Sequence, residues 1–473
     1  MKKVKKLLAL SLIGFMFLTA CGNNDKATDE KADTKVEAEN KEAEKTDDNA
    51  DADKEGEETP DQAKAEENKD LKGEITFSTW GSEQEIETNK EIIKAFEAKY
   101  PGTKVNLEVI NDDYDTTIET RFLGGQAPDV IYGHPRTFLP WIKQGMLMDI
   151  SDVYEAHPEW FDEDKYMTNL YDSYKDDGKY YATVNGADTL LLFYNKDLIE
   201  SVGGKLPTKD STWEELIELG KLCTTKNEDG TPKTFGFSSD EQGYFGLQAY
   251  IYANGGRLVD DVMNPTKATF DTPEVVEILR NYQDKVYKHK CVPVADDWAY
   301  LTGGFAGGQF AMMVTGVWDI VYLSEIKDFE WDIVELPMAK ENSTHAVLYA
   351  GYAVSSQTKN PELAKEFAAF MMSKEGQTLL AKTGLITVAN KEVANSDEVL
   401  KFEGAPKNHK LRVDTLENST NIDVQTLAWQ EITSTVIQPN LDKLGGNTIT
   451  PEECAKEIND GVQKLLDEAN KDK

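Results

Sequence analysis

A strand–helix–strand pattern within residues 75–109 constrains the fold of this chain most strongly. Apolar residues alternate with polar ones at both ends of this stretch, which is the periodicity of β-strands. Between them, Ser82 and Glu85 have the spacing of a capping box, and the helix that follows ends at Pro101-Gly102. This order is that of a βαβ unit, which predicts a parallel sheet covered by helices.

Two side chains are expected at one edge of this sheet. Trp80 follows the first strand, and His134 follows a third apolar run at 129–132. Ligands of open α/β sheets bind beyond the carboxyl ends of the strands, so Trp80 and His134 should face one crevice. Further patterns predict short strands at 180–184 and 190–194 and helices that open after Thr212 and at Pro361.

The N-terminus has the composition of a secretory signal. Four lysines within the first six residues precede residues 7–20, which are apolar or small. The stretch Leu18-Thr19-Ala20-Cys21-Gly22 resembles the lipobox of bacterial lipoproteins, in which signal peptidase cuts before the cysteine and a diacylglyceryl group is attached to it. We therefore expect a lipoprotein signal peptide at 1–20 and a palmitate-type anchor on Cys21 at the outer face of the cell membrane. An ordinary signal peptide is the alternative.

An acidic spacer is predicted at 21–72. Its residues from Gly22 to Lys72 include 19 acidic residues and 9 lysines, and almost no large apolar ones, so it cannot bury enough surface to fold. An acidic tail that binds a cationic partner is the alternative. The signal contributes +4 and the spacer −10 to the net charge of −35, which leaves −29 on residues 73–473. This balance argues against a nucleic-acid partner, because phosphates require Lys and Arg.

Neither a metal site, a cofactor nor a catalytic centre is indicated by motif. Cys223, Cys291 and Cys454 are widely spaced, lack a CxxC partner and are expected to be buried, with one pair conceivably bridged. The sequence lacks a Gly-x-Ser-x-Gly elbow, an HExxH motif and a phosphate loop. Carboxylates are so abundant that a glycosidase pair cannot be judged by counting them.

Seven short stretches of the body stand in a familiar order. They are Trp80-Gly81, Ala127-Pro128-Asp129-Val130, Gly178-Lys179-Tyr180-Tyr181-Ala182, Tyr194-Asn195-Lys196-Asp197-Leu198, Ala253-Asn254-Gly255-Gly256, Phe310 to Trp318, and Glu375-Gly376-Gln377. Together they resemble family 1 extracellular solute-binding proteins, the maltose-binding-protein-like sugar receptors of ABC importers. The resemblance covers residues 73–473.

This resemblance implies a two-lobed, type II periplasmic-binding-protein-like α/β fold, in which each lobe is a mostly parallel sheet flanked by helices. A multi-segment hinge would join an N-terminal lobe (73–184 plus 345–397) to a C-terminal lobe (185–344 plus 398–473) and close over the ligand. The implied function is non-enzymatic: a monomer captures a carbohydrate, expected to be an oligosaccharide, and delivers it to an ABC permease. A polyamine or other non-sugar solute and a secreted glycoside hydrolase are the alternatives.

A sugar site needs flat aromatic side chains, and carboxylates and amides for the hydroxyl groups. Trp318 is the strongest candidate, because a buried strand and Gly316 precede it. Trp80 and Trp429 are further stacking candidates, with core packing as the alternative for each. Trp298, Tyr300 and Tyr352 are weaker candidates.

Five polar candidates accompany the tryptophans. Asp188 lies beside an apolar run, where a carboxylate is costly to bury unless it is used. By similarity, Asp188, Arg136 and Tyr244 occupy ligand-binding positions, although a surface salt bridge is an equal contender for Arg136. Gln242 stands where the family has an acid, which could alter substrate preference. Glu83 begins a helix, where the helix dipole favours its charge in any case.

Overall fold

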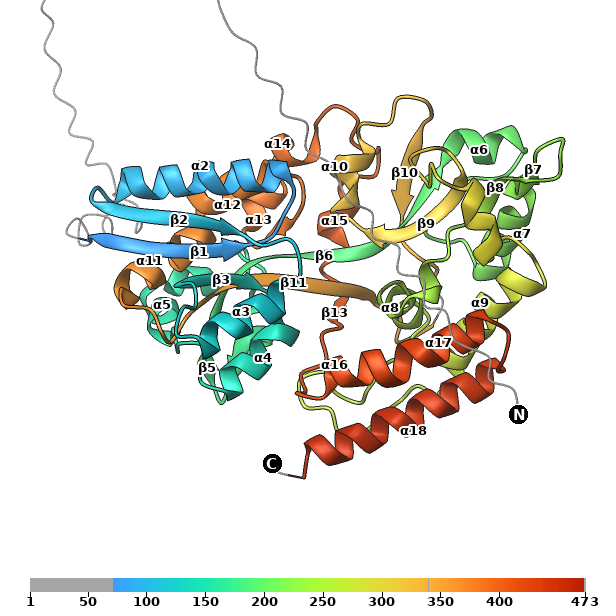
Figure 1. The fold of residues 1–473 in the computed structure, drawn as a ribbon. Coiled ribbons are helices and arrows are strands. Elements are labelled where there is room, and N and C mark those ends of the chain that lie inside the picture. The colour runs from blue at the N-terminus through green and yellow to red at the C-terminus, as the bar shows by residue number, and fades with distance from the viewer. Residues whose placement is uncertain (1–70, 339, 472–473) are drawn as a thin grey trace, which may run out of the picture. The chain divides into compact units, whose positions relative to one another are not determined.

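Strands from distant parts of the chain form one sheet in the computed structural model, which describes residues 71–338 and 340–471 (Figure 1). Its order is β2-β1-β3-β11-β6-β9-β8-β7, and β10 and β12 also pair with β6, and β13 with β11. The bounds are β1 Gly73–Thr79, β2 Thr103–Val109, β3 Val130–Gly133, β6 Ala182–Asn195, β7 Thr225–Lys226, β8 Pro232–Phe237, β9 Phe310–Gly316, β10 Trp331–Val334, β11 His345–Val354, β12 Thr387–Val388 and β13 Ser419–Asn421. A separate two-stranded sheet joins β4 (Lys175–Asp176) to β5 (Lys179–Tyr180). The predicted signal peptide, Cys21 and the spacer up to residue 70 lie outside the described residues.

The predicted βαβ unit is confirmed. Strands β1 and β2 pair in parallel from Gly73 opposite Thr103 to Thr79 opposite Val109, and β3 pairs in parallel with β1. Helix α2 (Glu83–Lys99) opens with the predicted capping box, in which Glu85 accepts the backbone N–H of Ser82 and the Ser82 hydroxyl accepts that of Glu85. The capping box at Thr212 and Glu215 opens α7 (Trp213–Cys223), and α11 begins at Pro361.

The prediction of two short strands at 180–184 and 190–194 is wrong, because β6 is one strand that is buried over its whole length. Polar residues interrupt the apolar pattern of the sequence at 185–188, and their hydrogen-bond partners lie in distant parts of the chain. Gly186 faces β12 so closely that a Cβ atom there would lie 2.2 Å from the Thr387 carbonyl oxygen. Asp188 accepts hydrogen bonds from the backbone N–H and the hydroxyl of Thr387, both at 3.0 Å.

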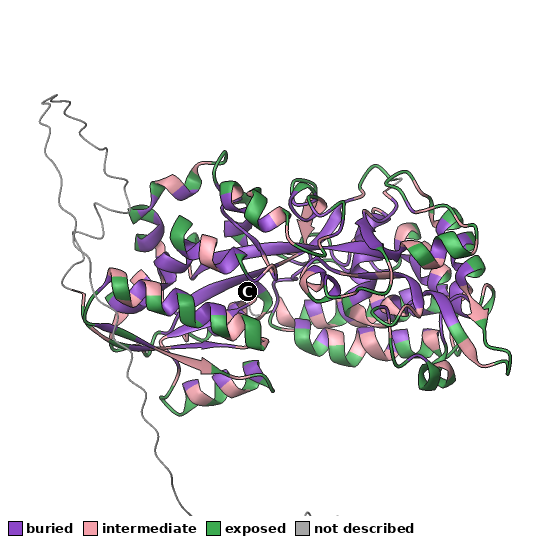
Figure 2. Cartoon of the chain, turned by 90° about the horizontal axis from the view of Figure 1, so that it is seen from above, coloured by how far each residue is buried: buried purple, intermediate pink, exposed green. Residues whose placement is uncertain are grey.

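Strand β6 contributes to two large hydrophobic cores. Its first half supplies Ala182, Val184 and Ala187 to a core that draws on residues 75–187 and 347–416. Its second half supplies Leu190, Leu192 and Tyr194 to a core that draws on 190–346 and 422–466. Figure 2 shows the buried residues concentrated along the strands and the exposed ones on the outer helices. The lobe boundaries given above remain a prediction.

Helices cover both cores. Around the first core are α2, α3 Tyr114–Leu123, α4 Pro135–Lys143, α5 Ser151–Ala156, α11 Pro361–Met372, α12 Lys374–Ala381, α13 Lys391–Ala394 and α14 Asp397–Leu400. Further helices are α6 Lys196–Ser201, α7, α8 Tyr244–Ala253, α9 Pro273–Tyr287, α10 Asp319–Leu323, α15 Leu411–Asp414, α16 Trp429–Ile432, α17 Gln438–Gly445 and α18 Pro451–Ala469. No helix within the described ranges is both long and apolar enough to cross a membrane. Cys223, Cys291 and Cys454 are buried and unpaired.

Candidate functional site

A cavity of about 330 Å³ lies between the two halves of the sheet. Its walls come from the ends of β1 and β3, the first turns of α2, the middle of β6 and β11, the start of α8, the segment after β9 and the loop at 380–386. We call it the first cavity. It therefore collects residues from both cores, and both tryptophans with the highest expectation, Trp80 and Trp318, line it.

Trp80 belongs to an aromatic wall at the end of β1. Its ring centroid lies 4.8 Å from that of Tyr114, 4.5 Å from that of Tyr132 and 5.3 Å from that of His134. Trp80 itself is only partly buried, so part of the indole remains open to the cavity. The expectation that Trp80 and His134 face one crevice is confirmed.

His134 supplies a neutral imidazole to this wall. Burial, together with the positive charge of Arg136, lowers the pKa of His134 to about 3. Its Nδ1 atom lies 2.7 Å from the Tyr349 carbonyl oxygen, and a carbonyl can only accept, so Nδ1 carries the proton. Nε2 is then left as a hydrogen-bond acceptor, which suits a hydroxyl group.

Trp318 lines the same cavity and packs against the second core. Its indole folds back over Gly316, where a Cβ atom would lie 2.2 Å from the ring, so only glycine leaves room for this orientation. Gly316 was noted in the sequence because it directly follows a buried strand. In the structure it matters because it has no side chain. The exposed ring of Phe245 lies 6.0 Å from that of Trp318 and extends the wall.

Asp188 lies in the cavity wall but is already bound to neighbouring residues. Besides its two hydrogen bonds from Thr387, its Oδ1 lies 3.8 Å from a terminal nitrogen of Arg412, which is completely buried. Arg412 also donates to the Thr387 hydroxyl at 3.0 Å and to the Gly384 carbonyl at 2.9 Å. Burial raises the pKa of Asp188 to about 6, against the opposing effect of Arg412. This network fixes the loop at 383–386, which lines the cavity.

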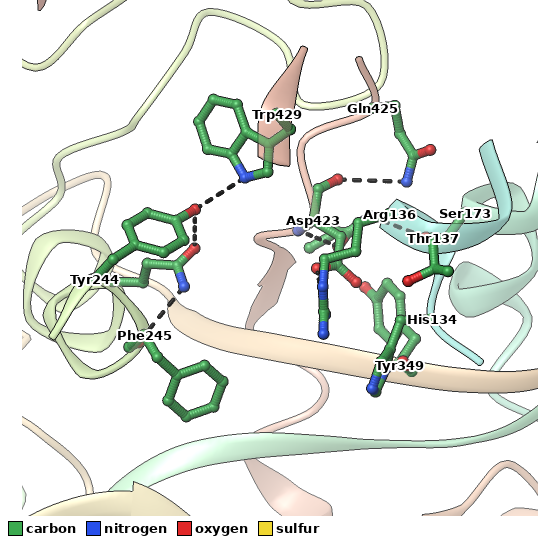
Figure 3. Close-up of polar contacts among 12 residues, drawn as sticks. His134, Arg136, Thr137, Ser173, Tyr244, Phe245, Tyr349, Asp423, Gln425 and Trp429 are labelled. Atoms are coloured by element: carbon green, nitrogen blue, oxygen red, sulfur yellow. Dashed lines mark hydrogen bonds and ion pairs between the residues drawn. The ribbon is translucent and has the colours of Figure 1, made fainter. Parts of the chain in front are cut away.

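A second cavity of about 300 Å³ adjoins the first, and Figure 3 shows polar side chains that line it. Tyr244 and Trp429 line it, and the Trp429 indole N–H donates to the Tyr244 hydroxyl at 3.2 Å. That hydroxyl donates in turn to Gln248 at 2.8 Å. On the facing side, Arg136 forms an ion pair with Asp423 at 3.2 Å. Trp429 is only 5% exposed, so it packs in the second core and also borders this cavity.

Six of the eight predicted ligand residues line one or both cavities. Trp80, Asp188 and Trp318 line the first, Tyr244 and Trp429 the second, and Arg136 both. Glu83 and Gln242 are exposed and line neither. Residues at positions i and i+2 of a helix point roughly 200° apart. Glu83 therefore faces away from Glu85, which does line the first cavity. Ligand contact by these residues stays a prediction.

The weaker candidates are divided. Tyr352 lines the first cavity, 5.5 Å from the ring of Tyr132. Trp298 and Tyr300 are exposed on a short 3₁₀ helix and line neither cavity. Trp298 instead packs against Phe310 at 5.7 Å.

Sequence reasoning missed several wall residues. Tyr132 is the last residue of the third predicted strand, and this position at the strand end could have identified it as a residue of the cavity wall. Phe245 directly follows Tyr244 at the start of α8, where an exposed aromatic side chain is unusual. No local sequence pattern identified Arg412 and Asp423 as site residues, because their partners Asp188 and Arg136 are far away along the chain. Among the described residues, no cluster of three His, Cys, Asp or Glu side chains is arranged for a metal ion.

Residues 91–407 match the family of bacterial extracellular solute-binding proteins. The chain belongs to this family. A relative of this solute-binding protein is the galactooligosaccharide-binding protein of Bacillus subtilis (strain 168), which is 26% identical over 342 residues, 69% of this chain and 75% of the relative.

Solved structures show the same fold as this solute-binding protein. An ABC substrate-binding protein from Listeria monocytogenes, solved in complex with cycloalternan, is 26% identical and superimposes with a TM-score of 0.73 over 84% of this chain and 99% of that one. Maltose-bound MalE3 of T. maritima is 22% identical, with a TM-score of 0.66 over 83% and 99%. The fold is the two-lobed α/β fold of type II periplasmic binding proteins.

Proposed function

We propose that the protein is an extracytoplasmic, lipid-anchored receptor that captures an oligosaccharide and delivers it to an ABC permease. One observation carries the proposal: Trp80 and Trp318, on elements of different cores, face the same cavity. Aromatic faces supplied by the two halves of the molecule suit the apolar faces of a pyranose ring. Closure of the two lobes over the ligand would give the permease a bound form to recognise.

Polar groups of the first cavity favour a neutral ligand over a polyamine. A polyamine needs carboxylates that are free of other partners, whereas Asp188 faces Arg412 and Glu85 accepts the Ser82 N–H. His134 is neutral, and Asn185 has a buried side-chain oxygen without a hydrogen-bond partner. Neutral acceptors and amides match hydroxyl groups. The relatives named above are binding proteins for an oligosaccharide, which supports the same class of ligand.

A saccharide panel tests this function. We expect one or more neutral oligosaccharides to raise the melting temperature of residues 71–473, because a ligand at 100 times its Kd stabilises by about 2.7 kcal/mol. Calorimetry with the same saccharide should show binding heat, and the recovered sugar should be unchanged. An upshift with spermidine but with no saccharide would contradict the proposal, and released reducing ends would indicate a hydrolase instead.

Cys21→Ala tests the anchor. In cells that express the full-length chain, the wild-type protein should fractionate with the membrane and incorporate labelled palmitate. The variant should appear in the medium or in the soluble fraction without label, because the acyl chains supply the membrane affinity. Cys223→Ala is the matched control, since that thiol is buried in the body. Equal membrane retention of the Cys21 variant would contradict the proposed anchor.

A further inference from the structure

The two cavities share a wall. Arg136, Phe245 and Leu348 line both of them, so the two cavities adjoin at these three side chains. Arg136 also forms the ion pair with Asp423, which lines the second cavity. The boundary between the cavities is therefore lined by an ion-paired arginine and by the ring of Phe245. Figure 3 shows Arg136 next to its partner Asp423.

This ion pair joins the two halves of the molecule. Arg136 lies on α4, whose Phe138 and Trp141 belong to the first core. Asp423 follows β13, and its neighbours Ile422 and Val424 belong to the second core. A ligand that reaches this boundary therefore meets both halves at once.

Asp423 is fixed in place, whereas Arg136 can adjust. The Asp423 side chain is 5% exposed, its N–H donates to the Asn421 side chain at 2.8 Å, and its carbonyl accepts from Gln425 at 3.4 Å. The Arg136 side chain is 41% exposed, and the bond to Asp423 uses one of its five N–H donors. The exposed guanidinium can therefore turn toward a ligand, while the buried carboxylate keeps its position.

Asp423 also carries an unpaired acceptor at the wall of the second cavity. Its Oδ2 is buried and has no hydrogen-bond partner among the described residues. The other two carboxylates in this wall also accept one side-chain hydrogen bond each, Asp115 from the Thr137 hydroxyl at 3.1 Å and Glu119 from the Trp141 indole at 2.9 Å, but neither has a buried oxygen without a partner. An O–H donor from a ligand is the group that Asp423 Oδ2 lacks.

We propose that the Arg136–Asp423 pair determines how long a saccharide the cleft prefers. Each cavity is near the lower limit of ~300 Å³ for a small-ligand site, so a longer ligand must pass the pair to enter the second cavity. There it places hydroxyl groups on Asp423 Oδ2 and on the remaining N–H groups of Arg136. A ligand confined to the first cavity leaves the pair unchanged. This inference rests on the proposed carbohydrate function.

Calorimetry with two saccharide series tests the inference: maltose to maltohexaose, and β-1,4-galactobiose to galactotetraose. For whichever series the wild-type protein binds, Asp423→Ala should weaken the binding of the longest members at least tenfold and that of the disaccharide less than twofold. Asp423→Asn, which keeps a hydrogen-bonding side chain of the same size, should recover part of the loss. If the alanine variant does not fold, the asparagine variant tests the inference instead. Its loss of affinity should then be at least threefold greater for the longest saccharides than for the disaccharide.

Asp176→Asn is the matched control. This substitution removes the ion pair between Asp176 and Lys143, and Lys143 lies on α4 like Arg136. Neither Asp176 nor Lys143 lines a cavity, so the affinity for saccharides of every length should stay unchanged. An equal loss for all lengths, or no loss in the Asp423 variants, would overturn this inference and leave the receptor function standing. If the wild-type protein binds no saccharide in either series or in the panel above, the proposed function itself fails, and this inference fails with it.

Discussion

Replacing Trp318 with alanine is expected to weaken oligosaccharide binding at least tenfold, which corresponds to about 1.4 kcal/mol. The indole lines the first cavity together with Trp80, and its orientation depends on the missing side chain of Gly316. Truncation removes a stacking surface that the ligand has no other means to replace. Because the ring is only partly buried, the melting temperature of the ligand-free protein should fall slightly. Calorimetry for affinity and a thermal melt without ligand measure the two effects separately.

Trp298→Ala is the matched control for this experiment. Trp298 is 40% exposed and lines neither cavity, so its truncation removes a comparable ring without touching the site. We expect wild-type affinity from this variant. Wild-type affinity from the Trp318 variant would remove that residue from the site and, with it, the main argument for a saccharide clamped between aromatic walls.

Replacing Lys285 with methionine is expected to lower the free energy of unfolding by about 3–5 kcal/mol, because it leaves the Glu241 carboxylate buried without its partner. Both side chains of this ion pair are 1% exposed. The Lys285 ammonium also lies 4.5 Å from the ring centroid of Phe237 and 4.9 Å from that of Tyr250, contacts that methionine replaces only in part. Chemical denaturation of the ligand-free protein measures the change.

A double-mutant cycle separates the pair from its surroundings. Glu241→Gln alone should destabilise by a similar amount, whereas the double variant Lys285→Met, Glu241→Gln should lose clearly less than the sum of the two. Lys410→Met, which breaks the exposed pair with Asp414, is the control and should change stability by less than about 0.5 kcal/mol. Additive losses in the cycle would show that the two charges do not stabilise one another. Since Glu241 lies on the short helix that precedes Tyr244, these variants also report how firmly that cavity wall is held.

Much of the site was predictable because side chains at strand ends have a fixed place in an α/β sheet. Trp80 and His134 follow directly from this rule, and Trp318 follows from a glycine at the end of a buried strand. Asp188 was identified from the cost of burying a carboxylate, but its partners Thr387 and Arg412 are about 200 residues away along the chain, where no local pattern connects them. For the same reason the sequence could not show that Asp423 reaches Arg136.

Periodicity and capping depend on neighbours within a few residues, so the sequence alone determined the βαβ unit, the helix starts and the α/β class. What only the tertiary structure decided was which polar residues stay buried and with whom. Residues 185–188 separate the two short strands predicted from the sequence, because the polar groups of Asn185 and Asp188 interrupt the apolar pattern. In the folded chain Thr387, Arg412 and the strand β11 supply partners for this stretch, and β6 continues unbroken from one core into the other.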